Sequence, residues 1–303
     1  MNLNMRLLIA GGDEDPNLKT LMAAAQRAGQ TVRPLLVGLT SHPSIVWEMT
    51  SDRFLMDGRA LACDAAFLRY DVFTALKHRR SAAAQFRALA WHTTLNGWLA
   101  AHSEIRMFNR RNLRYTTNKP LVLNLAQSFG LKIPDTVVTN DFSYLAQFEK
   151  NRRLVAKPVN GGGYCRSFEE VRRQTELKNE TTAAAPAIVQ NRLVAPEIRI
   201  YAVGKSFFAF EITSEELDYR TTPKARIEYI ENFSGELTGG LQKLLDALGL
   251  DFAAADFKTC PETGEPVFLE VNTSPMFAAF DSASKGSLSD SMLKFLIPTE
   301  NGK

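Results

Sequence analysis

The chain has 303 residues, of which 45% are hydrophobic and 23% are charged, and this composition excludes a chain that is mainly disordered. A total of 36 Lys and Arg against 33 Asp and Glu gives a net charge of +3, too small to favour nucleic acid or an anionic membrane as partner. No apolar run approaches the roughly 20 residues of a membrane span, and three widely spaced cysteines give no disulfide framework. We therefore expect a cytoplasmic protein of mixed α/β (α+β) class, with no nucleic-acid or membrane partner.

The first hundred residues alternate between short apolar runs and a helical pattern. Residues 18–28 carry apolar side chains at helical spacing and stop at Gly29. Residues 81–102 contain no proline and are rich in Ala, Leu and Trp, which predicts one or two helices. Alternation of this kind is typical of a small layer of parallel strands. Three runs are interpreted as buried strands: residues 6–10, 32–37 and 65–68.

The remainder of the chain is richer in strands. Residues 118–129 predict a helix with Pro120 in its first turn and Gly130 after its end. Residues 237–248 predict an amphipathic helix, and the low-complexity residues 181–185 predict a loop. Further strands are expected at residues 136–139, 154–157, 187–190, 197–203, 206–213, 252–259 and 266–272.

The last two of these strands carry the strongest indication of a site. A Thr-Gly turn at residues 263–264 predicts a hairpin that places Asp256 opposite Glu270, with Asn272 on the same face. Two carboxylates and an amide oxygen in apolar surroundings favour Mg²⁺, which binds oxygen donors together with nucleotide phosphates. The alternative is a solvated face whose acids pair with lysines such as Lys258.

A second pattern is a lysine followed by glycines. Lys157 lies at the end of an expected strand, ahead of Gly161, Gly162 and Gly163. Backbone N–H groups of such a loop can wrap phosphate oxygens while the lysine adds a positive charge. The order differs from that of a P-loop, and a plain tight loop after an exposed lysine is the alternative.

A third pattern combines acids with guanidinium groups. Strand alternation places Glu197, Arg199 and Tyr201 on one face. An acid and a guanidinium at a cleft can hold a ribose hydroxyl and a developing phosphoryl charge. Asp218 and Arg220 repeat the combination further along the chain. For both pairs, a structural ion pair is the alternative.

Taken in order, these elements resemble the ATP-grasp superfamily over residues 105–297. The likeness is to two branches, the RimK-type glutamate ligases and the microviridin-type peptide macrocyclases. Residues 208–212 and 218–220 resemble macrocyclase motifs, whereas Thr-Ser-Pro after Asn272 is closer to the glutamate ligases. The resemblance implies an ATP-grasp fold with an N-terminal pre-ATP-grasp α/β domain. The implied domains are residues 1–105, a central subdomain 106–192 and a C-terminal subdomain 193–303.

The resemblance also implies roles for individual residues. Magnesium is expected to bind at Asp256, Glu270 and Asn272. Arg199 is expected to stabilise the transferring phosphoryl group, and Arg220 is a weaker candidate for the same role. Nucleotide contacts are expected from Lys119, Lys157, Gly161, Gly162, Gly163, Gln190, Asn191, Leu193 and Glu197.

The implied activity is ATP-dependent ligation of a carboxylate to an amine or a hydroxyl through an acylphosphate, with ATP and Mg²⁺ required. The substrate is expected to be an amino acid or a peptide, and the departure after Asn272 leaves the acceptor open. Two other functions are left open: an ATP-grasp kinase acting on a small metabolite, and a nucleotide-binding module without catalysis. A homodimer is also left open.

Overall fold

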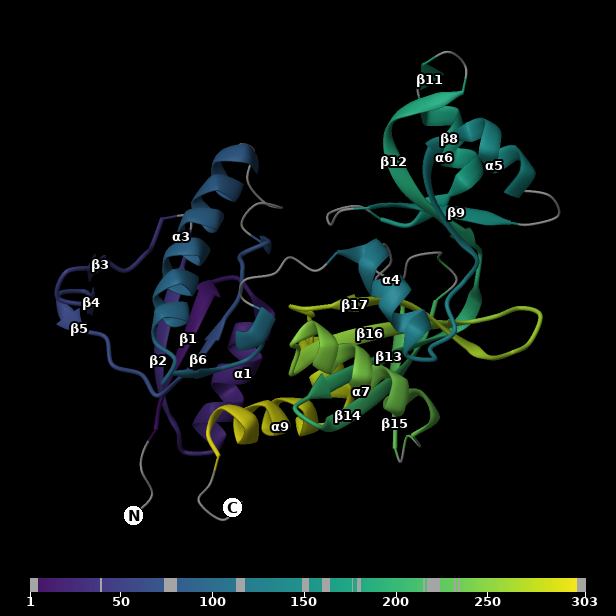
Figure 1. The fold of residues 1–303 in the computed structure, drawn as a ribbon. Helices are drawn as coiled ribbons and strands as arrows, with labels where there is room; N and C mark the ends of the chain where they lie inside the picture. Colours follow the sequence, from purple (N-terminus) through teal and green to yellow (C-terminus); the bar gives the residue numbers. More distant parts are fainter. Residues whose placement is uncertain are drawn as a thin grey trace. The chain divides into compact units, whose positions relative to one another are not determined.

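The computed structural model describes residues 5–38, 40–73, 81–112, 118–148, 153–159, 164–175, 177–178, 181–214, 216, 224–231, 233 and 235–298. The chain divides into two compact units (Figure 1). Unit 1 comprises residues 1–114, 250–252 and 276–303, and unit 2 comprises residues 115–249 and 253–275. The predicted domain boundaries after residues 105 and 192 stay predictions. None of the helices in the described ranges is long and apolar enough to cross a membrane.

A four-stranded parallel sheet forms the centre of unit 1, in the order β2-β1-β6-β7. Its members are β1 (Arg6–Gly12), β2 (Thr31–Val37), β6 (Ala65–Leu68) and β7 (Arg106–Met107). The three strands expected from apolar runs are all present, and their parallel pairing confirms the predicted layer. Helices α1 (Pro16–Arg27) and α3 (Ser81–Ala101) connect them, so the segment predicted as one or two helices is a single helix.

Helix α1 begins at Pro16, two residues before the expected start, and ends at Arg27, ahead of the predicted stop at Gly29. Asp15 is the N-cap, and its carboxylate accepts a hydrogen bond from the Asn17 N–H at 2.8 Å. Leu18 and Leu21 are fully buried, one turn apart. Gly29 adopts a φ of +67°, the left-handed conformation that glycine takes without strain after a helix.

A three-stranded sheet in unit 1 was not predicted from the sequence. It contains β3 (Ile45–Glu48), β4 (Arg53–Met56) and β5 (Arg59–Ala60). Phe54 of β4 packs on Trp98 of α3 with ring centroids 4.7 Å apart, which attaches this sheet to the unit 1 core. Asp57 and Gly58 between β4 and β5 both have positive φ, so the Asp-Gly pair is the hairpin signal that could have identified it.

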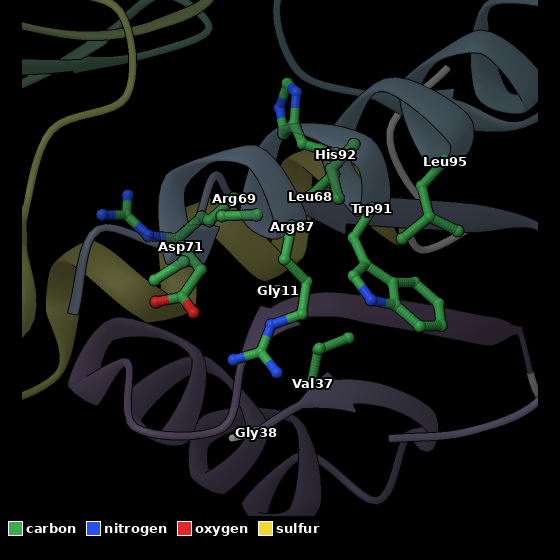
Figure 2. A pocket seen from close by; sticks show the side chains of 12 residues that line it. Gly11, Val37, Gly38, Leu68, Arg69, Asp71, Arg87, Trp91, His92 and Leu95 are labelled. Carbon is green, nitrogen blue, oxygen red and sulfur yellow. The ribbon is translucent and has the colours of Figure 1, made fainter. Parts of the chain in front are cut away.

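The carboxyl ends of the parallel strands in unit 1 are closed by charged side chains (Figure 2). Arg69 donates to the fully buried carboxylate of Asp15 at 2.7 Å. A Cβ on Gly12 would lie 2.5 Å from the Asp71 carboxyl group, so a larger residue would have to displace this acid. Ligands often bind at such strand ends, but the cavity here measures about 20 Å³, space for about one water molecule. The residues at these strand ends therefore pack closely and leave little room for a ligand.

The C-terminal helices belong to unit 1. They are α8 (Ala278–Ala283) and α9 (Ser287–Leu296). The Asn17 side-chain oxygen of α1 accepts hydrogen bonds from the N–H groups of Phe277 and Ala278, at 2.6 and 2.9 Å. The rings of Phe67, Phe252 and Phe277 come from segments far apart in the sequence, and each contacts the other two edge-on. The short 3₁₀ helix η1 (Arg110–Asn112) follows β7.

The first sheet of unit 2 is antiparallel and five-stranded. It contains β8 (Thr136–Asp141), β9 (Leu154–Pro158), β10 (Arg166–Ser167), β11 (Leu177–Lys178) and β12 (Thr182–Asn191). Helices α5 (Phe142–Phe148) and α6 (Phe168–Gln174) share a core with β9 and β12. The loop predicted at residues 181–185 is wrong, because most of it is the start of β12. Thr182 pairs with Asp141 of β8, and such long-range pairing leaves no local pattern in an alanine-rich segment.

The second sheet of unit 2 has the order β15-β14-β13-β16-β17. Its strands are β13 (Val194–Val203), β14 (Ser206–Thr213), β15 (Arg226–Ile230), β16 (Phe252–Thr259) and β17 (Pro266–Asn272). The other helices of unit 2 are α4 (Lys119–Ser128) and α7 (Glu236–Leu248), which ends at Gly249 with a φ of +68°. Strands β14, β16 and β17 have the predicted bounds.

Candidate active site

The acidic pair at the centre of the candidate site lies on the β16–β17 hairpin. Asp256 and Glu270 are directly paired in the antiparallel register, which confirms the hairpin expected from the Thr-Gly turn. The register shifts immediately afterwards, because Phe257 pairs with Phe268 and Leu269 is an extra residue on β17. A bulge of this kind redirects the neighbouring side chains and is common beside functional sites.

Asp256 is buried and is held by two side chains from neighbouring strands. Arg199 of β13 donates to it through Nε at 2.6 Å and Nη2 at 2.8 Å, a bidentate pair. Asn272 donates through Nδ2 to Asp256 Oδ2 at 2.9 Å. Two of the predicted metal ligands and the predicted phosphoryl-stabilising arginine are therefore brought together. The structural ion pair that the sequence left open for Arg199 is present, with Asp256 as its partner.

The three residues expected on one face of β13 are all buried. Glu197 and Arg199 are almost fully buried, and Tyr201 is fully buried, with its ring centroid 5.7 Å from that of Phe210. Tyr201 therefore packs in the core, and the two charged residues remain the candidates for contact with a ligand.

Lys119 places a positive charge beside the second acid of the pair, Glu270. Its Nζ lies 3.4 Å from Glu270 Oε2. The lysine is the first residue of α4, whose N-cap Asn118 accepts a hydrogen bond from the Leu121 N–H at 3.0 Å. Pro120 was the sequence signal for the first turn of this helix, and the structure adds Asn118 as its N-cap. The start of the helix fixes the position from which Lys119 reaches Glu270.

Lys157 approaches the same acids from the other sheet of unit 2. It lies near the end of β9, paired with Ile188 of β12. Burial lowers the pKa of Lys157, and the charges of Glu270 and, less strongly, Asp256 act in the opposite direction. The structure thus brings Lys119, Lys157 and Arg199 around two carboxylates.

Glu197 lies beside this cluster and pairs with a residue that we did not assign to the site. Lys258 Nζ of β16 is 3.2 Å from Glu197 Oε2. Both residues line a cavity of about 200 Å³ together with Leu193. Burial, with the neighbouring charge of Asp256, raises the pKa of Glu197 from 4.5 to about 7, although Lys258 and Arg199 act against this.

This raised pKa predicts a pH-dependent stability. Between pH 4.5 and about 7 the folded protein keeps a proton on Glu197 that the unfolded chain has released, so the free energy of unfolding falls as the pH rises. The shift corresponds to about 3 kcal/mol. We expect Glu197→Gln to abolish this dependence, so that the difference in unfolding free energy between wild type and variant changes by about 3 kcal/mol across the window. Urea titrations from pH 4.5 to 7.5 measure it, and a constant difference contradicts the assignment.

Gln190, Asn191 and Leu193, which are expected to contact the nucleotide, differ in their surroundings. Gln190 is buried, and its Nε2 donates to Thr136 Oγ1 at 2.9 Å. Asn191 and Leu193 line a cleft of about 810 Å³, a size that suits a small ligand. Within the described residues, Asn191 Oδ1 is buried without a hydrogen-bond partner. An amino group of a nucleotide base is one donor that would satisfy it.

Four predicted site residues lie outside the residues that the structure describes. They are Gly161, Gly162 and Gly163 of the glycine loop, and Arg220.

The oxygen donors of the acidic pair fit Mg²⁺ with nucleotide phosphates better than a metal held by protein alone. In the described ranges, no group of three or more His, Cys, Asp or Glu side chains is placed to hold a metal ion. Asp256 and Glu270 supply two carboxylates, and Asn272 keeps its amide oxygen while donating through nitrogen. Mg²⁺ commonly uses one or two carboxylates and completes its shell with phosphate oxygens and water.

Comparison with solved structures decides the fold. The ATP-grasp ligase PsnB, in complex with a minimal precursor, superposes with a TM-score of 0.75 at 22% identity, over 97% of this chain and 99% of that one. The chain has the ATP-grasp fold. Macrocyclase MdnC from Microcystis aeruginosa MRC, bound with precursor peptide MdnA, gives a TM-score of 0.67 at 17% identity, over 97% and 99% of the two chains.

A third ATP-grasp structure agrees with the first two. It is a RiPP-associated ligase from Chryseobacterium gregarium in complex with ADP and a leader and core peptide, with a TM-score of 0.67, 20% identity, and 97% and 96% of the two chains covered. No family model matches the sequence. No curated protein matches it either. The ATP-grasp fold expected from the sequence motifs is confirmed, and the structural neighbours include the macrocyclase branch.

Proposed function

We propose that this protein is an ATP- and Mg²⁺-dependent ligase that joins a carboxylate to an amine or hydroxyl on a peptide substrate, through an acylphosphate. The observation that carries the proposal is the cluster of Asp256 and Glu270 with Lys119, Lys157 and Arg199, within an ATP-grasp fold. A peptide is favoured over a free amino acid because three structural neighbours are described with precursor or leader and core peptides.

The first step transfers a phosphoryl group. A substrate carboxylate oxygen attacks the γ-phosphorus of ATP, and the bond to the β–γ bridging oxygen breaks so that ADP leaves with the electron pair. Lys119 and Lys157 hold the phosphates, and Glu197 accepts hydrogen bonds from the ribose. Asp256, Glu270 and Asn272 would hold Mg²⁺, which when bound would supply charge neutralisation at the phosphates. Positioning and charge are sufficient for this chemistry, and no protein nucleophile is required.

The second step forms the product bond. The amine or hydroxyl attacks the acyl carbon, inorganic phosphate leaves with the bonding electrons, and the nucleophile releases a proton. Arg199, next to Asp256 at the acidic pair, stabilises the transferring phosphoryl group and the acylphosphate. Arg220 stays a weaker candidate for the same role. The product is an amide or an ester.

A screen for ADP release tests the proposal directly. The purified protein is incubated with MgATP and pools of amino acids and acid-rich peptides, and ADP is measured with and without each pool. We expect ADP release that depends on a peptide carboxylate and is accompanied by loss of water from the peptide mass. ADP release with a product heavier by one phosphate favours the kinase. Nucleotide binding with no release under any pool favours the non-catalytic module.

Nucleotide binding itself is expected to stabilise the fold. MgATP at a hundredfold excess over its Kd adds about 2.7 kcal/mol to the free energy of unfolding, which raises the melting temperature by several degrees for a chain of this size. Lys157→Ala should lose most of that shift because the lysine faces the phosphates. Lys132→Ala is the matched control, since Lys132 forms an exposed ion pair with Glu265. If no nucleoside triphosphate shifts the wild type, the site assignment is wrong.

A further inference from the structure

The ion pair of Glu197 and Lys258 is built into the wall of the 200 Å³ cavity. Glu197 lies on β13 and Lys258 on the neighbouring strand β16. Their side chains are only 11% and 16% exposed, and the Nζ–Oε2 distance is 3.2 Å. A surface ion pair exchanges freely with water, whereas a pair this buried has a restricted geometry.

The neighbouring charges show why Glu197 depends on this lysine. Asp256, two residues before Lys258 on β16, repels the Glu197 carboxylate. Arg199 lies close by but is committed to Asp256 through two hydrogen bonds. Among the described residues, the ammonium group in contact with Glu197 is that of Lys258. Removal of Lys258 therefore leaves a buried carboxylate beside another acid, free to rotate or to take a proton.

We propose that Lys258 is a positioning residue for ribose recognition, which holds the Glu197 carboxylate so that its oxygens accept hydrogen bonds from the two adjacent ribose hydroxyls of ATP. The inference rests on the proposed function, because it requires a nucleotide in this cavity. It adds a residue to the site and predicts the specificity that the residue controls. The protein should distinguish ribonucleotides from deoxyribonucleotides, and this discrimination should depend on Lys258.

Equilibrium binding of ATP, 2′-deoxy-ATP and 3′-deoxy-ATP with Mg²⁺ tests this. A hydrogen bond to a charged group changes affinity by about 10- to 100-fold, so the wild type should bind the deoxy analogues that much more weakly. Lys258→Met keeps the apolar stem but loses the charge, and its discrimination should fall to within about threefold. Lys258→Arg should retain most of it. Lys205→Met is the matched control, because Lys205 pairs with Asp246 on the exposed surface at 3.1 Å.

A double variant separates positioning from a direct contact. Glu197→Gln should also lose the discrimination, and adding Lys258→Met to it should weaken ATP binding by no more than about twofold, because the two residues act as one unit. Additive losses overturn the inference. So does a Lys258→Met protein that discriminates like the wild type, which leaves the proposed function intact. If Lys258→Met does not fold, Lys258→Arg and Glu197→Gln still test the inference. A Glu197→Gln protein that discriminates between ATP and the deoxy analogues as well as the wild type does contradicts it. A wild type that binds no nucleotide overturns the proposed function instead.

Discussion

Replacing Glu270 with Gln is expected to reduce Mg²⁺-dependent ADP formation by about a thousandfold or more, which corresponds to about 4 kcal/mol of lost stabilisation. Gln keeps the size of the side chain but removes the charge that a metal ion requires. Glu270 pairs with Lys119 at 3.4 Å, and its charge also favours the charged form of the buried Lys157, so its loss should cost some stability. Because Gln fills the same volume, the fold should persist. Steady-state ADP release with the acceptor from the peptide screen measures the effect, with the melting temperature as a check on folding.

Two further variants test whether the loss of ADP formation is specific to the proposed metal ligands. Glu265→Gln removes an exposed acid of the same hairpin, which pairs with Lys132, and should leave ADP release unchanged. Asp256→Ala should abolish activity like Glu270→Gln, and in addition it should cost about 3–5 kcal/mol of stability, because it strands the buried guanidinium of Arg199. Full turnover in both the Glu270 and Asp256 variants shows that the metal assignment is wrong.

The second large effect is expected at Arg199. Arg199→Ala should leave the affinity for ATP within a few-fold of wild type and reduce turnover by about a hundredfold or more, the scale of one lost oxyanion donor. The reason is that the guanidinium acts where charge moves, so its loss affects the transition state more than the ground state. Stopped-flow or steady-state kinetics give turnover, and equilibrium titration gives ATP affinity.

The buried pair of Arg199 with Asp256 means that the Arg199 prediction needs a control for protein stability. Arg199→Ala leaves the buried Asp256 carboxylate without its bidentate partner, so part of any loss can come from misfolding. Arg199→Lys keeps the charge but cannot form the planar fork, and it should show a smaller loss of turnover at near-native stability. Arg226→Ala removes an exposed ion pair with Glu228 on β15 and should change neither quantity. Equal losses of ATP affinity and turnover in Arg199→Ala contradict a transition-state role.

Local sequence signals predicted the positions of several candidate-site residues. Asn118 and Pro120 define the start of α4 and therefore the position of Lys119. The Thr-Gly turn fixes the hairpin register, and with it the pairing of Asp256 with Glu270. In both cases the information lies within a few residues of the feature, which is why sequence alone was sufficient.

Features that depend on pairing between distant strands could not be predicted. Arg199 and Asp256 are 57 residues apart, and nothing in either strand specifies the other as its partner. The bulge at Leu269 is a property of the paired ladder, so β17 alone carries no sign of it. Lys258 appeared in the sequence only as a general counter-charge, and its pairing with Glu197 follows from the order in which β13 and β16 lie side by side.

Trapping the activated carboxylate tests the central claim most directly. The wild type is incubated with MgATP, the carboxylate substrate from the screen and hydroxylamine, which attacks an acylphosphate to give a hydroxamate. We expect one hydroxamate for each ADP released, at the carboxylate that otherwise forms the amide or ester, and none above background with Glu270→Gln. A stable phosphorylated product that is not an acylphosphate, with ADP but no hydroxamate, contradicts the ligase and identifies a kinase.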